Sequence, residues 1–425
     1  MTTPFFTQAS DDKLSDVSIQ IALPMNKDLN SLLLSYPCCV LLYYTKSITR
    51  QGRTNSEFTQ CSSIRMEASK TKESQGAAAD DEIQPRPAAA SPPALPWTVR
   101  LQVLALVTAT DLSQRRDGTV NRFLFSLGDR QTPARARPDA LGVRSADVTV
   151  DASRNLWARV YSRSSSGSSA VPVPVVVYFH GGGFAFLSAA STPLDGMCRR
   201  LCRELGAVVV SVNYRLAPEH KFPAAYDDGE AVFRHLAANN DIFPVPVDLS
   251  RCFLAGDSAG GNIAHHVAHR WTSDAEPDPV VFRLAGIILL QPYFGGEERT
   301  AAELSLEGVA PVVNMRRSDW SWKAFLPVGA DRNHPAAHVT GEAAPEPELG
   351  ENFPPAMVAV GGLDPLQDWQ RRYAAMLRRK GKAVRVVEFP EAIHAFYCFP
   401  ELPDSGKLVE DVKAFIDRNG GTRVL

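Results

Sequence analysis

The sequence has no excess of charge of either sign. Its 425 residues include 45 Lys and Arg and 47 Asp and Glu, so the formal net charge is −2. A chain that binds nucleic acid or an anionic membrane surface through bulk charge needs an excess of basic residues, so neither partner is expected. The function must therefore be sought in small groups of residues along the chain.

Cysteines are few, and their spacing shows no pairing. There are seven, an odd and scattered set without a CxxC pair. This pattern argues against a disulfide framework and favours a reducing compartment, so we expect a cytoplasmic location, with the nucleus as a further one. Cys198 and Cys202 lie four residues apart at helical spacing, which we interpret as packing rather than as a metal or redox site.

A long apolar run is also lacking. The run LLLSYPCCVLLYY at residues 32–44 has 13 residues and contains Pro37, whereas a membrane-spanning helix needs about 20. It lies too far from the first residue to be a signal peptide. Residues 65–93 are rich in Ala, Pro, Ser and charge and cannot bury enough apolar surface to fold. We predict that residues 1–92 are a disordered leader and that residues 93–425 are the folded domain.

The folded part alternates between two kinds of pattern. Residues 97–113 have apolar side chains at helical spacing, and residues 145–151 and 155–162 predict two strands joined by a turn. Short runs that are apolar throughout then alternate with helical stretches. Strands that are apolar on both faces indicate a parallel sheet covered by helices, so the sequence predicts an α/β fold. The six runs are residues 175–179, 207–212, 252–256, 285–290, 356–361 and 384–389.

The stretch GDSAGGN at residues 256–262 follows one of these runs and precedes a helical stretch. In the pattern GxSxG at a strand-to-helix turn, glycines permit a strained backbone and the serine hydroxyl is exposed at the helix N-terminus. Ser258 is therefore the candidate nucleophile. The alternative is a glycine-rich turn whose serine only caps the helix.

A serine nucleophile needs a base that takes its proton and an acid that orients the base. α/β hydrolases carry these groups in the order Ser, Asp or Glu, His. Of nine histidines, only His394 follows the last predicted strand; a surface-loop histidine is the alternative. Asp364 comes directly after a predicted strand, and Asp368 is the alternative acid, with helix capping as the ordinary role of either residue.

The oxyanion that forms during acyl transfer needs hydrogen-bond donors. The stretch HGGGF at residues 180–184 follows a predicted strand, and its glycines allow backbone N–H groups to turn toward one point. Gly182, Gly183 and Ala259 are therefore the candidate oxyanion hole. A phosphate-binding loop is the alternative, but no GK[ST] or GxGxxG pattern follows and the loop carries no lysine.

Five motifs together resemble the hormone-sensitive lipase family of serine esterases, in its plant branch of carboxylesterases and gibberellin receptors. They are HGGGF, GDSAGGNIAHH, NYRLAPEHKFPAAYDD, GLDPLQD and IHAF. The resemblance implies an α/β-hydrolase fold, a mostly parallel central sheet flanked by helices with an N-terminal helical lid at residues 93–135. It implies no metal and no organic cofactor. Asp227 and Asp228, in the third motif, could form an acid–base pair, but we assign them to structure.

Two classes of function occur in this branch. Carboxylesterases hydrolyse small esters, whereas the receptors hold a hormone under the lid and recruit a protein. The receptors have HGGSF where this chain has Gly183, lack the histidine that this chain keeps at His394, and carry a lid lysine near the position of Val107. The resemblance favours a serine carboxylesterase that acts on a small-molecule ester. The alternative is a gibberellin-receptor-like binding protein, and only that alternative implies a protein partner.

The substrate pocket is expected between the lid helix and the segment that precedes the last two strands. Aromatic residues in this segment predict an apolar wall, for which core or lid packing is the alternative. No cation is evident in it, which favours neutral esters with short to medium acyl chains. The wall comprises Tyr293, Phe294, Trp320, Trp322 and Phe325, and the expected pocket residues are Phe184, Tyr293 and Trp322.

Overall fold

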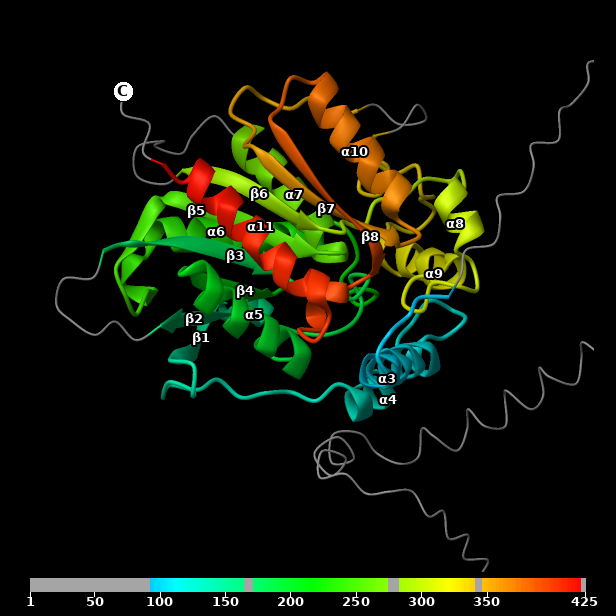
Figure 1. The fold of residues 1–425 in the computed structure, drawn as a ribbon, viewed down its shortest axis with the longest axis horizontal. Helices are drawn as coiled ribbons and strands as arrows, with labels where there is room; N and C mark the ends of the chain where they lie inside the picture. The colour runs from blue at the N-terminus through cyan, green and yellow to red at the C-terminus, as the bar shows by residue number, and fades with distance from the viewer. Residues whose placement is uncertain (1–91, 164–170, 274–282, 341–345, 422–425) are drawn as a thin grey trace, which may run out of the picture.

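The computed structural model describes residues 92–163, 171–273, 283–340 and 346–421 (Figure 1). Residues 1–91 lie outside this part of the chain, so the disordered leader stays a prediction. The boundary of the folded domain near residue 93 stays a prediction with it.

An eight-stranded sheet forms the centre of the molecule, in the order β1-β2-β4-β3-β5-β6-β7-β8. The pairs β1–β2 and β2–β4 are antiparallel, and all other neighbours are parallel. The predicted α/β-hydrolase fold with a mostly parallel sheet is confirmed. The strands are β1 (Val143–Asp151), β2 (Leu156–Arg163), β3 (Val173–Phe179), β4 (Val208–Asn213), β5 (Val247–Asp257), β6 (Leu284–Leu290), β7 (Ala356–Leu363) and β8 (Val384–Ile393).

Helices bury both faces of the sheet, as the fully apolar strands predicted. Along β3, Val175, Val177 and Phe179 belong to one apolar core, and Val176 and Tyr178 belong to the other. Successive side chains of a strand point to opposite faces, so both faces must be covered. The first core includes α6 (Ala224–Ala238), α7 (Ala259–Ser273) and α10 (Gln367–Arg379), and the second includes α5 (Thr192–Leu205) and α11 (Pro403–Asn419), which crosses the front of the sheet in Figure 1.

The N-terminal helical segment, α3 (Trp97–Ser113) and α4 (Arg122–Gly128), lies beside α9 (Met315–Phe325) (Figure 1). The helix predicted at residues 97–113 is confirmed. The carboxylate of Asp111 accepts hydrogen bonds from Nε and Nη2 of Arg317, each at 2.8 Å. The indole Nε1 of Trp320 donates to the carbonyl oxygen of Arg115 at 2.9 Å. The shorter elements are α8 (Ala301–Ser305), η1 (Ala152–Arg154), η2 (Asn240–Ile242) and η3 (Phe396–Cys398).

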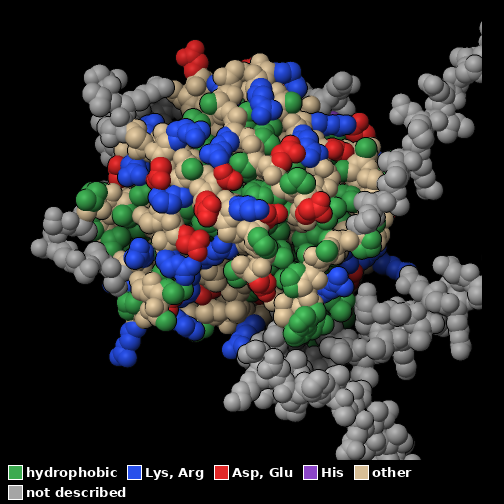
Figure 2. All heavy atoms as spheres, in the orientation of Figure 1, with side chains coloured by type: hydrophobic (Ala, Val, Ile, Leu, Met, Phe, Trp, Pro, Cys, Tyr) green, Lys and Arg blue, Asp and Glu red, His purple; other side chains and the backbone are tan. Residues whose placement is uncertain are grey.

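Basic and acidic side chains are mixed on the face shown in Figure 2, and neither sign forms a continuous patch there. This distribution agrees with the near-zero net charge of the sequence. Within the residues that the structure describes, no helix is both long and apolar enough to cross a membrane.

Candidate active site

Ser258 lies at the sharp turn between β5 and α7. Its φ is +52°, in the left-handed region that non-glycine residues seldom adopt. The turn needs glycine on both sides. A Cβ at Gly256 would lie 2.2 Å from the Gly260 carbonyl oxygen, and a Cβ at Gly260 would lie 1.9 Å from that of Phe179. The glycines of the motif therefore allow the strained turn that a nucleophile elbow requires.

His394 and Asp364 meet at the ends of two neighbouring strands. Asp364 follows β7, His394 follows β8, and Nδ1 of the imidazole lies 2.8 Å from Oδ2 of Asp364. Asp364 is fully buried, and its carboxylate also accepts hydrogen bonds from the Leu366 backbone N–H and from Nε2 of Gln370. The contact joins Nδ1 to Asp364, so Nε2 of His394 is the ring nitrogen left for exchange of a proton with the serine.

The contacts of Asp364 and Asp368 differ in the structure, and they favour Asp364, the acid that the sequence also favoured. Oδ2 of Asp368 accepts a hydrogen bond from the Ala302 backbone N–H at 2.8 Å, on the side of α10 that faces α8. Asp364, and not Asp368, is the acid in contact with the imidazole.

Ser258 and His394 line the same cavity. Among the described residues, no hydrogen bond joins the Ser258 hydroxyl to the imidazole. Such bonds are often long without substrate and tighten when it binds, so the arrangement is compatible with proton transfer between the two groups.

The candidate oxyanion donors border the same cavity as Ser258. Gly182 and Gly183 have φ values of +107° and +58° and line the cavity, and Ala259 is the first residue of α7. No hydrogen bond described in the structure uses the backbone N–H of any of the three as donor. Free N–H groups beside a serine hydroxyl can stabilise an oxyanion.

The cavity has a volume of about 490 Å³ and a mostly apolar lining. A space of this size holds a small or medium ligand. The helix α3 closes one side of it, α9 closes another, and the turns after β3, β5 and β8 form the floor. The lining of α3 consists of Gln102, Leu106, Val107, Ala109 and Thr110.

Two of the three expected pocket residues do not line the cavity, which corrects the prediction. Tyr293 does line it, but Phe184 and Trp322 are fully buried in the core behind the cavity. Phe184 stacks on Phe325 with ring centroids 3.8 Å apart, and Trp322 stacks on Tyr293 at 4.3 Å. The core-packing alternative holds for Phe184 and Trp322, because both rings pack against other aromatic rings and neither lines the cavity. The aromatic rings that line the cavity beside Tyr293 are Phe125, Phe186 and Phe399.

Two guanidinium groups line the cavity, although no cation was evident from the sequence. Arg317 forms an ion pair with Asp111, which also pairs with Arg316, and its Nη1 donates to the carbonyl oxygens of Pro311 and Val312 at 3.1 Å. Arg130 is exposed and forms no ion pair within 4.0 Å among the described residues. The expectation of a wall without cations was therefore wrong, although the inner cation is held in an ion pair with Asp111.

Two polar residues that sequence analysis missed lie between the catalytic candidates. Oε1 of Gln291 accepts from the Ala395 backbone N–H at 2.8 Å and its Nε2 donates to the Ile393 carbonyl at 3.2 Å, so one amide holds both neighbours of His394. Asp257, next to Ser258, is 4% exposed and lines the cavity. Burial raises the pKa of its carboxyl group. The one sequence signal for Asp257 was its place directly before the nucleophile in GDSAGGN, and nothing in the sequence indicated Gln291.

The structural assignment of the acid pair is confirmed. Asp228 is buried and accepts from both Nε and Nη2 of Arg215. Asp227 accepts from Arg270 at 2.7 Å. Neither residue lines the active-site cavity.

The packing role of the cysteines is also supported. Cys198 and Cys202 are free and buried in α5, and burial raises the pKa of both thiols. No group of three or more His, Cys, Asp or Glu in the described ranges is placed to hold a metal ion.

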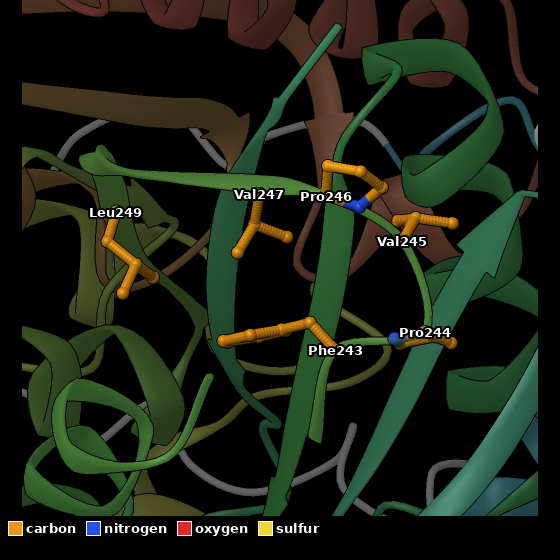
Figure 3. A pocket seen from close by; sticks show the side chains of 6 residues that line it. All are labelled: Phe243, Pro244, Val245, Pro246, Val247 and Leu249. Carbon is orange, nitrogen blue, oxygen red and sulfur yellow. The ribbon is translucent and has the colours of Figure 1, made fainter. Parts of the chain in front are cut away.

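A second hollow, of about 410 Å³, lies at the start of β5 (Figure 3). This is the amino end of the strand, whereas Ser258 follows its carboxyl end. No lining side chain is titratable or nucleophilic, so this hollow offers no chemistry. The lining residues are Phe243, Pro244, Val245, Pro246, Val247 and Leu249.

Comparisons with known proteins agree with this fold. Residues 176–398 match the model of a family described as having the alpha/beta hydrolase fold. The chain is 42% identical to gibberellin receptor GID1C of Arabidopsis thaliana over 320 residues, which cover 73% of this chain and 90% of the receptor. It is 37% identical to carboxylesterase 20 of the same plant over 282 residues, 64% of this chain and 84% of that protein.

A solved structure shows the same architecture. An esterase from Pyrobaculum calidifontis superposes with a TM-score of 0.56 at 28% identity, covering 76% of this chain and 92% of the esterase. The extent of the family match and the identity to the plant proteins together establish that this chain belongs to the α/β-hydrolase family, in the branch of plant carboxylesterases and gibberellin receptors.

Proposed function

We propose that this carboxylesterase-type hydrolase cleaves small, neutral carboxylic esters through a Ser258–His394–Asp364 triad. One observation carries the proposal: His394 is hydrogen-bonded to a buried Asp364 and borders the same cavity as the strained Ser258. A serine, a base that takes its proton and an acid that orients the base are what acyl transfer requires.

The reaction has two steps. Oγ of Ser258 attacks the ester carbonyl carbon while Nε2 of His394 takes its proton, and the backbone N–H groups of Gly182, Gly183 and Ala259 bind the oxyanion. The alcohol leaves with the proton from His394, and an acyl-enzyme remains. Water then attacks the acyl group with His394 again as the base, which releases the acid and restores Ser258.

The cavity lining supports the class of substrate. Its surface is largely apolar, and the inner guanidinium of Arg317 is ion-paired with Asp111. An uncharged acyl chain can therefore bind against the apolar lining without breaking this ion pair. The volume of about 490 Å³ favours short to medium chains.

The alternative is a binding protein that uses the same cavity without turnover. Its support is the similarity to gibberellin receptor GID1C, which is 42% identical over 73% of this chain, against 37% over 64% for carboxylesterase 20. Two features speak against this alternative: His394 with its acid partner, and Gly183 in the oxyanion loop. The receptor motifs described above have a serine in place of Gly183 and lack the histidine.

Two measurements on one preparation separate these functions. The esterase predicts steady turnover of 4-nitrophenyl acetate and butyrate, and a fluorophosphonate probe that labels the wild type but not Ser258→Ala. The receptor-like alternative predicts saturable gibberellin binding and no turnover. Absence of both hydrolysis and serine labelling would refute the esterase.

A further inference from the structure

Asp257 is a buried acid at the candidate active site that the proposed mechanism does not use. It precedes Ser258 and lines the cavity, and only 4% of its surface is exposed. Its Oδ1 accepts hydrogen bonds from the Gly181 backbone N–H at 2.8 Å and from the Tyr178 hydroxyl at 2.5 Å. Its Oδ2 accepts one from the Tyr397 hydroxyl at 3.3 Å. A buried carboxylate with three donors is held in a single position.

These donors belong to the segments that carry the other candidate catalytic groups. Gly181 directly precedes the proposed oxyanion donors Gly182 and Gly183. Tyr397 lies in η3, three residues after His394. One carboxylate therefore connects the turns after β3 and β8 with the elbow after β5, although these turns are far apart in the sequence.

The shape of the oxyanion loop fits the carboxylate closely. A Cβ at Gly181 would lie 2.5 Å from Oδ2 of Asp257 and 3.2 Å from its backbone oxygen. Contacts below 3.0 Å do not occur for real Cβ atoms, so any side chain at residue 181 would displace the carboxylate or the loop. The first glycine of HGGGF is thus required by the acid of GDSAGGN, and the two motifs form one packed unit.

We propose that Asp257 is a positioning residue, whose carboxylate holds the oxyanion loop and the histidine loop in register with Ser258. The inference rests on the proposed esterase function. It assigns to Asp257 no contact with the reacting atoms. The carboxylate acts through the peptide of Gly181 and the hydroxyl of Tyr397, and through them it positions the oxyanion donors. A shift of these donors by a fraction of an ångström weakens transition-state binding more than substrate binding.

The test compares Asp257→Ala and Asp257→Asn with a matched control, Asp195→Asn. Asp195 is also a buried acid that accepts from a tyrosine, Tyr161 at 2.9 Å, but it lies in α5 and does not line the cavity. We expect Asp257→Ala to lower kcat for 4-nitrophenyl acetate by about 100-fold with KM nearly unchanged. Asp257→Asn keeps an acceptor for the Gly181 N–H and should recover most of the loss. The control should keep its kcat per folded molecule.

A second readout separates positioning from general stability. A trifluoromethyl ketone that forms an oxyanion on Ser258 should lose affinity in proportion to kcat in the Asp257 variants, whereas a neutral substrate analogue should bind as before. If Asp257→Ala does not fold, Tyr397→Phe and Gly181→Ala replace it, with expected losses of about threefold and more than tenfold in kcat.

The outcomes are distinct. A wild type that hydrolyses esters and labels at Ser258, with folded Asp257 variants that keep kcat and ketone affinity within threefold, would overturn the positioning role alone. A loss of activity that only follows the folded fraction, as for the Asp195 control, would also overturn it. An inert wild type would remove the esterase function and this inference together.

Discussion

At the scale of single residues, positive φ angles at Ser258 and in the oxyanion loop shape the reactive geometry. Ser258 is a non-glycine residue at +52°, and Gly183 stands at +58° in the oxyanion loop. Left-handed backbone costs a non-glycine residue roughly 1–3 kcal/mol. The surrounding packing must therefore hold Ser258 in its strained conformation, and substitution of Gly183 by a residue with a side chain would carry the same cost.

His394 decides between catalysis and binding. We expect His394→Val to lower kcat for an aryl acetate by about 1000-fold or more, because without the imidazole no group takes the serine proton, and the oxyanion donors alone retain only residual catalysis. Stopped-flow or steady-state assays of the purified variant measure this loss, with circular dichroism to verify folding. A reduction below tenfold in a folded variant would contradict the triad.

Gly183 distinguishes this chain from the receptor pattern HGGSF. A Cβ there would lie 2.7 Å from Oγ of Ser321, so Gly183→Ser combines left-handed strain with a collision. We expect kcat to fall by about 10- to 100-fold, because the loop that carries the proposed donors must shift. The double variant Gly183→Ser/Ser321→Gly should recover part of the loss.

The matched control for Gly183→Ser is Gly308→Ser. Gly308 also has a positive φ, +77°, but a Cβ at this residue would have no other atom within 4 Å. This variant should show a similar strain cost in thermal unfolding and an unchanged kcat. If both variants lost kcat equally, the collision with Ser321 would not be the cause.

At the scale of elements, Asp111 of α3 forms ion pairs with Arg316 and Arg317 of α9. Asp111 contacts Arg317 at 2.8 Å. Although burial acts to raise the pKa of Asp111, the hydrogen bonds and charges of Arg317 and Arg316 hold it below its usual value. We expect Asp111→Asn to increase amide hydrogen exchange in residues 97–113 by about five- to tenfold and to raise KM.

The control for the Asp111 variant is Asp117→Asn. Asp117 accepts hydrogen bonds from Thr119 alone, on the exposed loop after α3. It should leave the exchange rates of α3 unchanged. Equal exchange in Asp111→Asn and in the wild type would show that apolar packing by itself holds α3 against α9.

Asp129, at the end of α4, predicts a pH dependence of stability. Burial raises its pKa to about 6, against hydrogen bonds from Ser191 and Gln131. A raised pKa in the folded state means that this group stabilises the fold most below pH 3.8, and that the contribution is lost as pH rises through about 6. The ionised group then destabilises the fold by up to roughly 3 kcal/mol.

The variant Asp129→Asn isolates this effect. Relative to the wild type, it should become more stable as pH rises from about 4.5 to 7, because Asn stays neutral while Asp129 ionises. Chemical unfolding at both pH values measures the difference. A difference in unfolding free energy that does not change with pH would show that Asp129 is not perturbed.

At the scale of the whole molecule, the parallel sheet assembles the candidate site. Ser258, Asp364 and His394 follow β5, β7 and β8, and the carboxyl ends of parallel strands meet at one edge. Three residues from distant parts of the chain therefore reach one cavity. The two apolar cores on either face of the sheet keep that edge rigid.

Both cores and the cavity lining consist of residues in the described ranges after residue 91. Deleting residues 1–65 should therefore leave kcat/KM for a short aryl ester within about twofold and the unfolding temperature within a few degrees. Activity and thermal unfolding of the truncated chain, beside the full chain, measure both. A large loss of either would show that the N-terminal segment contributes to the fold.

Local patterns in the sequence determined the elements and the order of the candidate catalytic residues. Helical spacing predicted α3, fully apolar runs predicted the parallel strands, and glycines around Ser258 predicted the turn, because each depends on neighbours in the chain. The positions of Asp364 and His394 after strands followed from the same patterns, which also favoured Asp364 over Asp368, and the structure added the contact between Asp364 and the imidazole.

Tertiary packing alone decided which side chains face the cavity. Phe184 and Trp322 turned into the core, whereas Phe125 and Phe399 turned toward the cavity, and no local pattern distinguishes these rings. The contacts of Asp257 were equally hidden, since its partners come from turns that the sheet alone brings together. Side-chain direction in a loop is set by the segments that pack against it, and those segments are distant in the sequence.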